Sequence, residues 1–388
     1  MKKTLLATAI AGALGVTAAA QAATVYDQDG TQVDVYGRIN YGITTGGTDQ
    51  ATGFVPGTGV GGVEATGETK NTGSEFVDVF SRFGFRARHQ VAPTMQVFAN
   101  MEFRPDLTAQ NDDSMVIRNS FIGLRDDNFG MFRVGNFDGV VYQAVTSKFE
   151  VHEYEGFTTI SGGPIGARGD SVQYSTPVLG GFQAHVQAKH ASGNDQPVGA
   201  QDNSSTVSWQ AAVNYQWQDL YLAAGYNQSK DLADRGASYS GGGAYAAGED
   251  IWTVMASYQF TPQFSARVKY EEVSDTFSQE ELTARAQAAA VAENDARVRS
   301  IVGSMENLWT VGATFDYGMG EIYADYNRVR SAFEGVDSRN VWTLGANYRF
   351  SRPMYVWAEI HDANFDTDDS ISDLNDELRY TVGLRYDF

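Results

Sequence analysis

The strongest constraint on this chain is a two-residue alternation of apolar and polar side chains that recurs in several segments. The last segment places its apolar residues on one parity: Leu378, Tyr380, Val382, Leu384, Tyr386 and Phe388. The other parity carries Arg379, Thr381, Gly383, Arg385 and Asp387. Segments 209–217, 309–317 and 342–350 repeat the pattern. Because successive side chains of a strand point to opposite faces, the sequence predicts strands with one apolar and one polar face.

The chain lacks a long apolar run after its first residues. A membrane-spanning helix needs about 20 mostly apolar residues, and no such run occurs between Ala23 and Phe388. A closed β-barrel is the other structure in which every backbone N–H and C=O group can form a hydrogen bond within a lipid bilayer. The alternatives are therefore a barrel and an exported sandwich with a buried apolar face. Aromatic residues at strand ends, such as Trp209 with Trp217, favour the barrel, because such rings lie at membrane interfaces.

The first residues have the organisation of a secretory signal peptide. Lys2 and Lys3 precede an apolar stretch from Leu5 to about Ala20, which ends in the small-residue motif Ala20-Gln21-Ala22. This order is typical of an export signal with its cleavage site. We expect a signal peptide over residues 1–22 and one folded domain over residues 23–388.

Short turns and long polar connections alternate along that domain. Tight turns are predicted at 92–94, 127–128, 179–181, 218–219, 261–262, 318–320 and 351–353. Long polar stretches lie near 45–75, 104–114, 138–168, 191–205, 230–248, 274–305, 332–338 and 364–377. The segments between them predict an all-β fold, a sixteen-stranded antiparallel transmembrane barrel, wide enough to enclose water. The sixth long stretch is rich in Ala, Glu and Arg from Ser278 to Arg299, and Ser278-Gln279-Glu280-Glu281 resembles a capping box, so a short helix is expected within this stretch.

Composition argues against several classes of function. The chain has no cysteine and a net charge of −20, which argues against disulfide stapling and against nucleic-acid binding. No nucleophile motif or His/Cys metal spacing is present, so we expect neither an enzyme, a cofactor nor a metal centre. Of the five histidines, His152 alone is expected where solutes would pass. The acidic stretch 364–377 is consistent with a solvated loop or with a divalent-cation site.

Several segments, in order, resemble the general diffusion porins of Gram-negative bacteria, the sixteen-stranded trimeric type. The matching segments are 25–31 with 33–38, 81–85, 118–124, 135–142 and the aromatic end 386–388. The resemblance implies an outer-membrane, water-filled channel for passive diffusion of ions and small hydrophilic solutes. It also implies a homotrimer, contact with lipopolysaccharide and outer-membrane lipid, and a terminal Phe388 read by the barrel-assembly machinery.

In that family the third long loop folds into the barrel and its acids face a basic wall. The loop would be 138–168 here, with Glu150, Glu153 and Glu155 as its acids. The family usually carries Pro-Glu-Phe-Gly-Gly at the loop centre, whereas this chain has His152 for the proline and Glu155 for the first glycine. The resemblance places four arginines on the constriction wall: Arg38, Arg82, Arg118 and Arg168.

Strand parity gives an independent expectation for several of these side chains. In the first two strands, Arg38 and Arg82 alternate with apolar residues that would face lipid or a neighbouring subunit, including Val77, Val79 and Phe83. Arg118 is expected inside because its parity is opposite to that of Phe121. Glu102 is expected inside by the same alternation.

Acids facing arginines would create a field across the pore, although each arginine could instead pair locally. The sign of the ion preference stays open. A substrate-selective channel, and a barrel acting mainly as an adhesin or enzyme, are the alternative functions.

Overall fold

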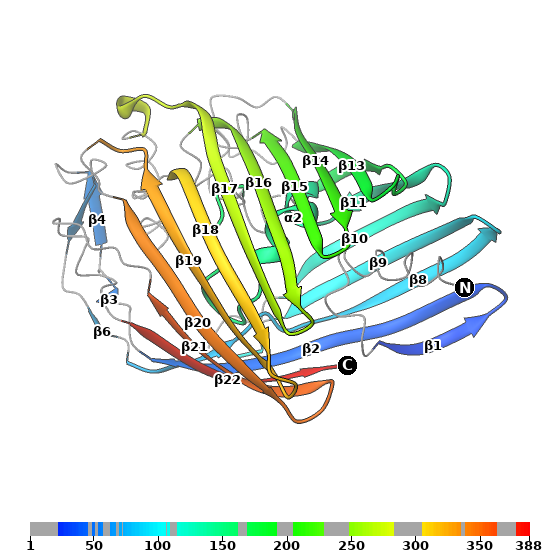
Figure 1. The fold of residues 1–388 in the computed structure, drawn as a ribbon, viewed down its shortest axis with the longest axis horizontal. Coiled ribbons are helices and arrows are strands. Elements are labelled where there is room, and N and C mark those ends of the chain that lie inside the picture. Colours follow the sequence, from blue (N-terminus) through cyan, green and yellow to red (C-terminus); the bar gives the residue numbers. More distant parts are fainter. Residues whose placement is uncertain are drawn as a thin grey trace.

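The computed structural model describes residues 22–45, 49–50, 53–56, 63–66, 70–71, 73–105, 107–108, 115–161, 169–191, 205–228, 248–282, 305–334, 338–362 and 378–388. Within these residues, eighteen strands form one antiparallel sheet, which closes where β2 pairs with β22. The ring of strands is seen obliquely in Figure 1. The first nine strands of the sheet are β1 (Ala23–Gln28), β2 (Thr31–Thr45), β7 (Glu75–Asp78), β8 (Arg82–Ala92), β9 (Met95–Pro105), β10 (Met115–Asp126), β11 (Gly130–Asn136), β12 (Asp170–Ser175) and β13 (Phe182–Ala191).

The remaining nine strands of the sheet follow in chain order. They are β14 (Thr206–Trp217), β15 (Leu220–Gln228), β16 (Gly248–Thr261), β17 (Phe264–Thr276), β18 (Met305–Asp316), β19 (Glu321–Ser331), β20 (Arg339–Arg349), β21 (Met354–Asp362) and β22 (Arg379–Asp387). Two small two-stranded sheets lie in the first long loop, β3 (Asp49–Gln50) with β6 (Lys70–Asn71) and β4 (Gly53–Pro56) with β5 (Val63–Thr66).

The eighteen strands occupy sixteen positions around the barrel. Both β7 and β8 pair with the same edge of β2, so they form one interrupted strand. On the other edge of β2, β1 pairs with its first half and β22 with its second half. The backbone of Gly37 exchanges hydrogen bonds of 2.7 and 2.9 Å with that of Phe388 at this junction. The prediction of a sixteen-stranded antiparallel barrel is confirmed.

The connections follow the predicted alternation of short turns and long loops. The Asp29-Gly30 turn between β1 and β2 has φ values of 52° and 74°, a conformation that Asp-Gly pairs adopt readily in tight hairpins. In the sixth long loop, residues 279–282 are helical, and the Ser278 hydroxyl accepts a hydrogen bond from the Glu281 amide at 3.2 Å. The expected helix therefore begins at its cap, and residues 283–304 of this loop lie outside the described residues.

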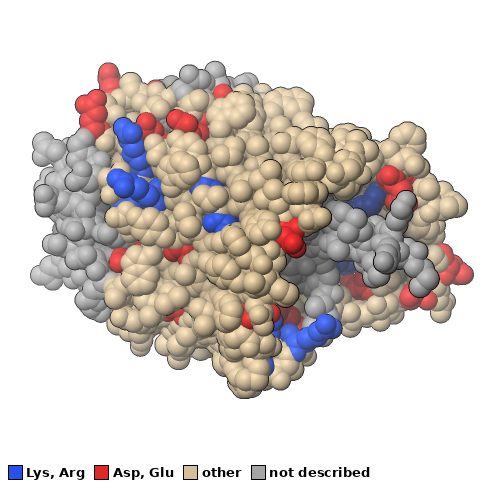
Figure 2. All heavy atoms as spheres, in the orientation of Figure 1, with Lys and Arg blue, Asp and Glu red and all other residues tan. Residues whose placement is uncertain are grey.

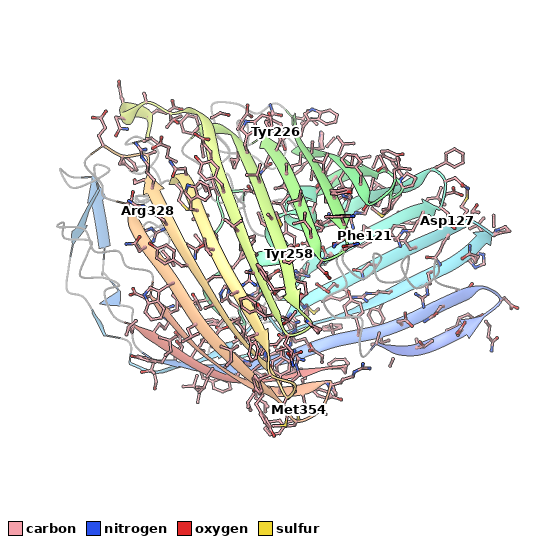
Figure 3. The ribbon with its side chains drawn as sticks, in the orientation of Figure 1. Phe121, Asp127, Tyr226, Tyr258, Arg328 and Met354 are labelled. Carbon is pink, nitrogen blue, oxygen red and sulfur yellow. The ribbon has the colours of Figure 1, made fainter. Side chains whose placement is uncertain are left out.

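The outer face of the barrel is apolar, as the alternation predicts. Its exposed side chains include Val254, Leu344 and Val382, each between 44 and 55% exposed. Aromatic pairs lie near both ends of the strands: the ring centroids of Tyr226 and Trp252 are 4.7 Å apart, and those of Tyr258 and Phe260 are 4.8 Å apart. In Figure 3, Tyr226 and Tyr258 mark these two levels. Uncharged residues cover most of the surface seen in Figure 2.

The interior contains the chain that follows β11. A short helix α2 (Val140–Ala144) and the 3₁₀ turn η2 (Thr146–Phe149) lie inside the ring of strands (Figure 1). Their apolar side chains form a buried cluster with inward residues of β14, β15 and β16. The expected inward fold of the third long loop is therefore confirmed. Among the described residues, no helix is long and apolar enough to cross a membrane.

Two local parity predictions are wrong because the strands contain irregularities. Tyr41 pairs with Asp78 whereas Arg38 pairs with Arg82, so one extra residue is inserted between β7 and β8. Such a bulge reverses the faces beyond it, and Val79 is consequently buried inside with Val77 packed against its cluster, instead of facing lipid.

A second irregularity lies in β10, where the register shifts between Ile117 and Asn119. Phe121 consequently faces the interior, where its ring meets that of Phe137 at 5.9 Å. The outward positions are those of Ile122 and Leu124, which are 59 and 37% exposed. Arg118 still faces inward, because the shift occurs at its own position.

Candidate functional site

The inward loop begins on the wall opposite the sheet closure. Val140, Val141 and Ala144 of α2 pack against inward side chains of β14 to β16, and each is at most 1% exposed. The amide of Val140 donates to the Gln187 side chain at 2.9 Å. The Tyr221 hydroxyl donates to the Ala144 carbonyl at 2.6 Å. The barrel wall therefore buries the apolar face of this segment and provides hydrogen-bond partners for two of its backbone groups.

Two buried carboxylates of the wall hold the backbone of the loop further on. Glu359 of β21 accepts hydrogen bonds from the amides of Glu153 at 2.5 Å and Tyr154 at 3.0 Å. Glu271 of β17 accepts those of Ile160 at 2.6 Å and Ser161 at 2.9 Å. Hydrogen bonds to a charged acceptor contribute about 1.5–3 kcal/mol each, so these two carboxylates fix the path of the loop across the interior.

Glu153 points from the loop into a polar cluster on the wall. Its carboxylate accepts from the Tyr355 hydroxyl at 2.5 Å, from the Asn40 amide at 3.0 Å and from Arg385 at 3.1 Å. The side chain is only 8% exposed. Burial raises the pKa of Glu153 to about 7, against the opposing effect of Arg38 and of the Tyr355 hydrogen bond.

Glu155 is paired in a similar way with the neighbouring part of the wall. Its carboxylate forms an ion pair with Arg379 of β22, and His361 lies 4.0 Å away. Burial raises the pKa of Glu155, and the opposing charge of Arg379 lowers it. Two of the three predicted loop acids therefore lie against β21 and β22, paired with arginines that the sequence interpretation did not name.

His152 does not lie in the path of solutes, and that expectation is wrong. Its side chain is 2% exposed, packed edge-on against the Tyr323 ring at 5.7 Å. Its Nε2 atom lies 3.4 Å from the Asp325 carboxylate. Burial lowers the pKa of His152 to about 3, assisted by the charges of Arg267 and His361. The imidazole fills the space between loop and wall as a neutral group.

Glu150 differs from the other two acids because its side chain is exposed to the interior. Its carboxylate accepts a hydrogen bond from the Tyr142 hydroxyl of the same loop. The guanidinium groups of Arg82, Arg118 and Arg38 act on it electrostatically. Glu150 thus lies on the edge of the loop that looks toward β2, β8 and β10.

The predicted wall residues come together on those strands. Arg38 and Arg82 occupy paired positions on β2 and β8. Arg118 forms an ion pair with Glu102, which is 5% exposed and also accepts from the Tyr36 hydroxyl at 2.9 Å. Asp138 lies 3.8 Å from Arg118. Arg168 lies outside the described residues.

The sequence interpretation missed four charged residues that shape this region: Arg379, Arg385, Glu359 and Glu271. Alternation already placed Arg379 and Arg385 on the polar face of the last strand, so their inward direction could have been found. Their pairing with particular loop acids depends on where the loop crosses the barrel, which strand periodicity does not contain. The backbone-holding role of Glu359 and Glu271 is likewise a tertiary feature.

The chain end closes the sheet beside this wall. The Phe388 ring lies over Gly37, so closely that a Cβ at Gly37 would meet it at 2.3 Å, and it stacks near Tyr386 with ring centroids 6.1 Å apart. Among the described residues, no group of three or more His, Asp or Glu side chains is arranged to hold a metal ion. The acidic stretch 364–377 is not among them.

A closed barrel with an apolar outside, a charged inside and an interior narrowed by its own loop defines a channel of the outer membrane. The model of the Gram-negative porin family matches residues 7–387. The chain therefore belongs to the Gram-negative porin family, and it functions as an outer-membrane porin, a water-filled channel for passive diffusion of ions and small hydrophilic solutes.

Individual relatives agree with this assignment. A monosaccharide porin of a Halomonas species is 27% identical, with 96% of this chain and 97% of the relative covered. Outer membrane porin F of Salmonella typhimurium is 22% identical over the full length of both chains. Among solved structures, OmpF of Salmonella typhi in complex with daunomycin has a TM-score of 0.65 at 17% identity, covering 94% of this chain and all of that one. OmpT of Vibrio cholerae lacking loop L8 has a TM-score of 0.58, also at 17% identity, with 93% and 100% covered. These structures share the fold.

Proposed function

We propose that diffusion through this porin is limited at the level of the inward loop, between its acids Glu150, Glu153 and Glu155 and the wall arginines Arg38, Arg82, Arg118 and Arg168. The observation that carries the proposal is the fixation of the loop backbone by Glu359 and Glu271. A loop held at both places keeps a constant cross-section, as a size filter requires. Fixed charges around a narrow passage orient water and polar solutes and disfavour apolar ones.

The proposal includes the cellular context of the protein. Residues 1–22 act as a cleaved export signal, and the mature domain begins at Ala23. The protein assembles as a homotrimer in contact with lipopolysaccharide, and Phe388 belongs to the segment recognised by the barrel-assembly machinery. The protein performs no catalysis; its wall charges act on solutes only through electrostatics and hydrogen bonding.

Proteoliposome swelling tests the general channel directly. The purified mature protein should admit sugars at rates that fall smoothly with their size, and planar bilayers should show stepwise currents in potassium chloride. A sharp preference for one sugar over another of the same size would contradict unspecific diffusion. Removing the bulk of the loop acid edge with Glu150→Ala should increase the rate for the largest sugar that still passes.

Substrate-selective transport is the second candidate, and the name of the Halomonas relative, a monosaccharide porin, favours testing it. A selective site holds its solute long enough to interrupt the ion current. Millimolar glucose, galactose or arabinose should therefore be added to single channels. Current block by one monosaccharide at low concentration would establish selectivity, and the absence of block by all three leaves the general channel.

A further inference from the structure

Two phenylalanine rings face the interior of the barrel between the inward loop and the mouth formed by the short turns. Phe98 of β9 and Phe121 of β10 are both half-buried, with ring centroids 6.2 Å apart and ring planes at 77°. Phe98 shares the inward parity of Glu102. In Figure 3, Phe121 is labelled part of the way along β10 and Asp127 at the turn that follows. An apolar ring on the water side of the wall makes no contact with lipid, so its exposed surface can take up a solute.

The residues beside Phe98 form a row across four neighbouring strands. Arg88 of β8 is the cross-strand partner of Phe98, whose partner on the other side is Gly123 of β10. The next partner of Gly123 is Arg133 of β11. Directly opposed residues share one face of a sheet, so all four positions face the interior. The Phe98 ring lies across Gly123, where a Cβ would come within 2.3 Å of the ring. The row therefore presents an aromatic ring with an arginine on either side.

The guanidinium groups around this ring are held by neutral partners. Arg88 donates from Nε to the side-chain oxygen of Gln32 at 3.1 Å. Arg133 donates two hydrogen bonds to the side-chain oxygen of Gln173, at 3.0 and 2.7 Å. Arg125, a third arginine on the same face, is exposed, and its guanidinium carbon lies 5.7 Å from the centroid of the nearby ring on β9. None of these partners carries a negative charge.

These arginines are therefore free to bind an anion. Within the part of the chain that the structure describes, none of the three lies within 4.0 Å of a carboxylate oxygen. The arginines beside the inward loop differ, because Arg118, Arg379 and Arg385 each pair with a carboxylate. The acids that act on the three arginines do so from farther away: Asp34, Asp127 and Asp138. Each guanidinium group has five N–H donors, so donors remain for a solute that enters the passage.

We propose that Phe98, Arg125 and Arg133 form a binding site for small aromatic carboxylates on the short-turn side of the inward loop. The ring of the solute stacks on the face of Phe98 and meets the edge of Phe121, because the two rings are nearly perpendicular. Its carboxylate accepts hydrogen bonds from the exposed guanidinium of Arg125, and the fixed charge of Arg133 attracts it. The inference rests on the porin function and goes beyond unspecific diffusion, since it gives one class of solute a site of its own.

Block of the single-channel current by benzoate tests the site. Benzoate, cyclohexanecarboxylate and acetate are added in turn to open channels in a planar bilayer at neutral pH, where all three acids are ionised. Cyclohexanecarboxylate carries the same charge on a ring of similar size that lacks a π-face. Benzoate should reduce the potassium chloride current at a half-effective concentration about threefold to tenfold lower than that of cyclohexanecarboxylate. Acetate, which has no ring, should be the weakest of the three.

Three variants separate the ring from the charge. Phe98→Leu keeps an apolar side chain but removes the ring, so it should abolish the difference between benzoate and cyclohexanecarboxylate. Arg125→Gln should weaken the block by both of these solutes about tenfold, because both lose a charge-assisted hydrogen bond. Phe103→Leu is the matched control: Phe103 lies on the same strand with outward parity, and its ring is stacked with that of Phe83 at 5.3 Å. It should leave the benzoate block unchanged.

Other outcomes overturn the inference. Equal block of the wild-type channel by benzoate and cyclohexanecarboxylate would show an effect of charge alone. An unchanged benzoate block in Phe98→Leu, or an equal loss of block in Phe103→Leu, would show that the Phe98 ring is not the contact. If Phe98→Leu fails to assemble, the exposed Arg125 decides, and an unchanged block in Arg125→Gln refutes the site. Silent bilayers with the wild-type protein would instead contradict the channel itself, so the two failures are distinguishable.

Discussion

Truncation of Glu271 should release the second half of the inward loop while leaving the barrel intact. This carboxylate is fully buried and accepts hydrogen bonds from the amides of Ile160 and Ser161 and from the Thr159 hydroxyl. It is also the partner of Lys269, whose ammonium group is equally buried. Glu271→Ala removes all of these contacts at once. The strand ladder between β16, β17 and β18 does not depend on the side chain.

The free energy with which Glu271 holds the loop to the wall can be estimated from these contacts. Breaking a buried ion pair by removing one partner costs about 3–5 kcal/mol, and each lost hydrogen bond to a charged acceptor costs about 1.5–3 kcal/mol. Because these contributions share one site and do not add fully, we expect the loop to be held about 5 kcal/mol less strongly. That change is sufficient to turn a fixed loop into one that exchanges between attached and detached positions.

Single-channel recording measures this exchange as open-state current noise and as substates. Glu271→Ala should show both, with folded barrels still present as heat-sensitive bands on gels. Glu272→Ala is the matched control, because Glu272 is the adjacent residue on the exposed outer face of β17. Currents of Glu271→Ala as quiet and as large as those of Glu272→Ala would refute the anchoring role of Glu271.

Three further predictions follow from the packing and charges. Burial raises the pKa of Glu153 from 4.5 to about 7, so the folded protein binds this proton more tightly than the unfolded chain does. The contribution of Glu153 to the free energy of unfolding should therefore be largest below about pH 4.5 and fall by up to about 3 kcal/mol as the pH rises through 7. Glu153→Gln should flatten this part of the pH profile of thermal unfolding, and an unchanged slope would exclude Glu153 as its source. Gly383→Ala should lower the unfolding temperature by the equivalent of about 1–3 kcal/mol, since a Cβ there would meet the Trp357 ring at 2.2 Å; an unaltered unfolding temperature would show that the ring moves freely. Val254 lies on the outer face and is 51% exposed, so Val254→Arg should destabilise the barrel in lipid by about 2–4 kcal/mol. Urea unfolding in vesicles measures this loss, with Val254→Leu as the control. Equal unfolding midpoints for the two variants would argue against contact of this position with hydrocarbon.

The barrel was predictable because its determinants are local. Alternation in segments such as 378–388 fixes which face is apolar, and turn residues such as Asp29 and Gly30 mark where strands reverse. Parity failed at Val79 and Phe121 for one reason: a single extra residue in a strand reverses every side chain beyond it. The position of such a bulge depends on pairing with the neighbouring strand, so it cannot be predicted from the alternation of apolar and polar residues.

The narrowed interior was predictable only in part. The resemblance to a family predicted that the third long loop folds into the barrel and predicted which acids it carries. Strand parity predicted that the Glu102 side chain points inward. The different surroundings of Glu150 and Glu153 arise from contacts between residues more than 200 positions apart, such as Glu153 with Tyr355 and Arg385. Pairing over such separations depends on the closed sheet. The reason for His152 in place of the family's proline is likewise visible only in the structure, where the imidazole packs against Tyr323 and Asp325 of the wall.

Quenching of tryptophan fluorescence by brominated phospholipids tests most directly whether the apolar face of this barrel lies in hydrocarbon and the polar face does not. Two single-tryptophan variants are needed, one retaining Trp209, which is 51% exposed on the outer face, and one retaining Trp357, which is 3% exposed on the inner face. Strong quenching of Trp209 with weak quenching of Trp357 is the predicted result. Equal quenching of both residues, or stronger quenching of Trp357, would contradict the account.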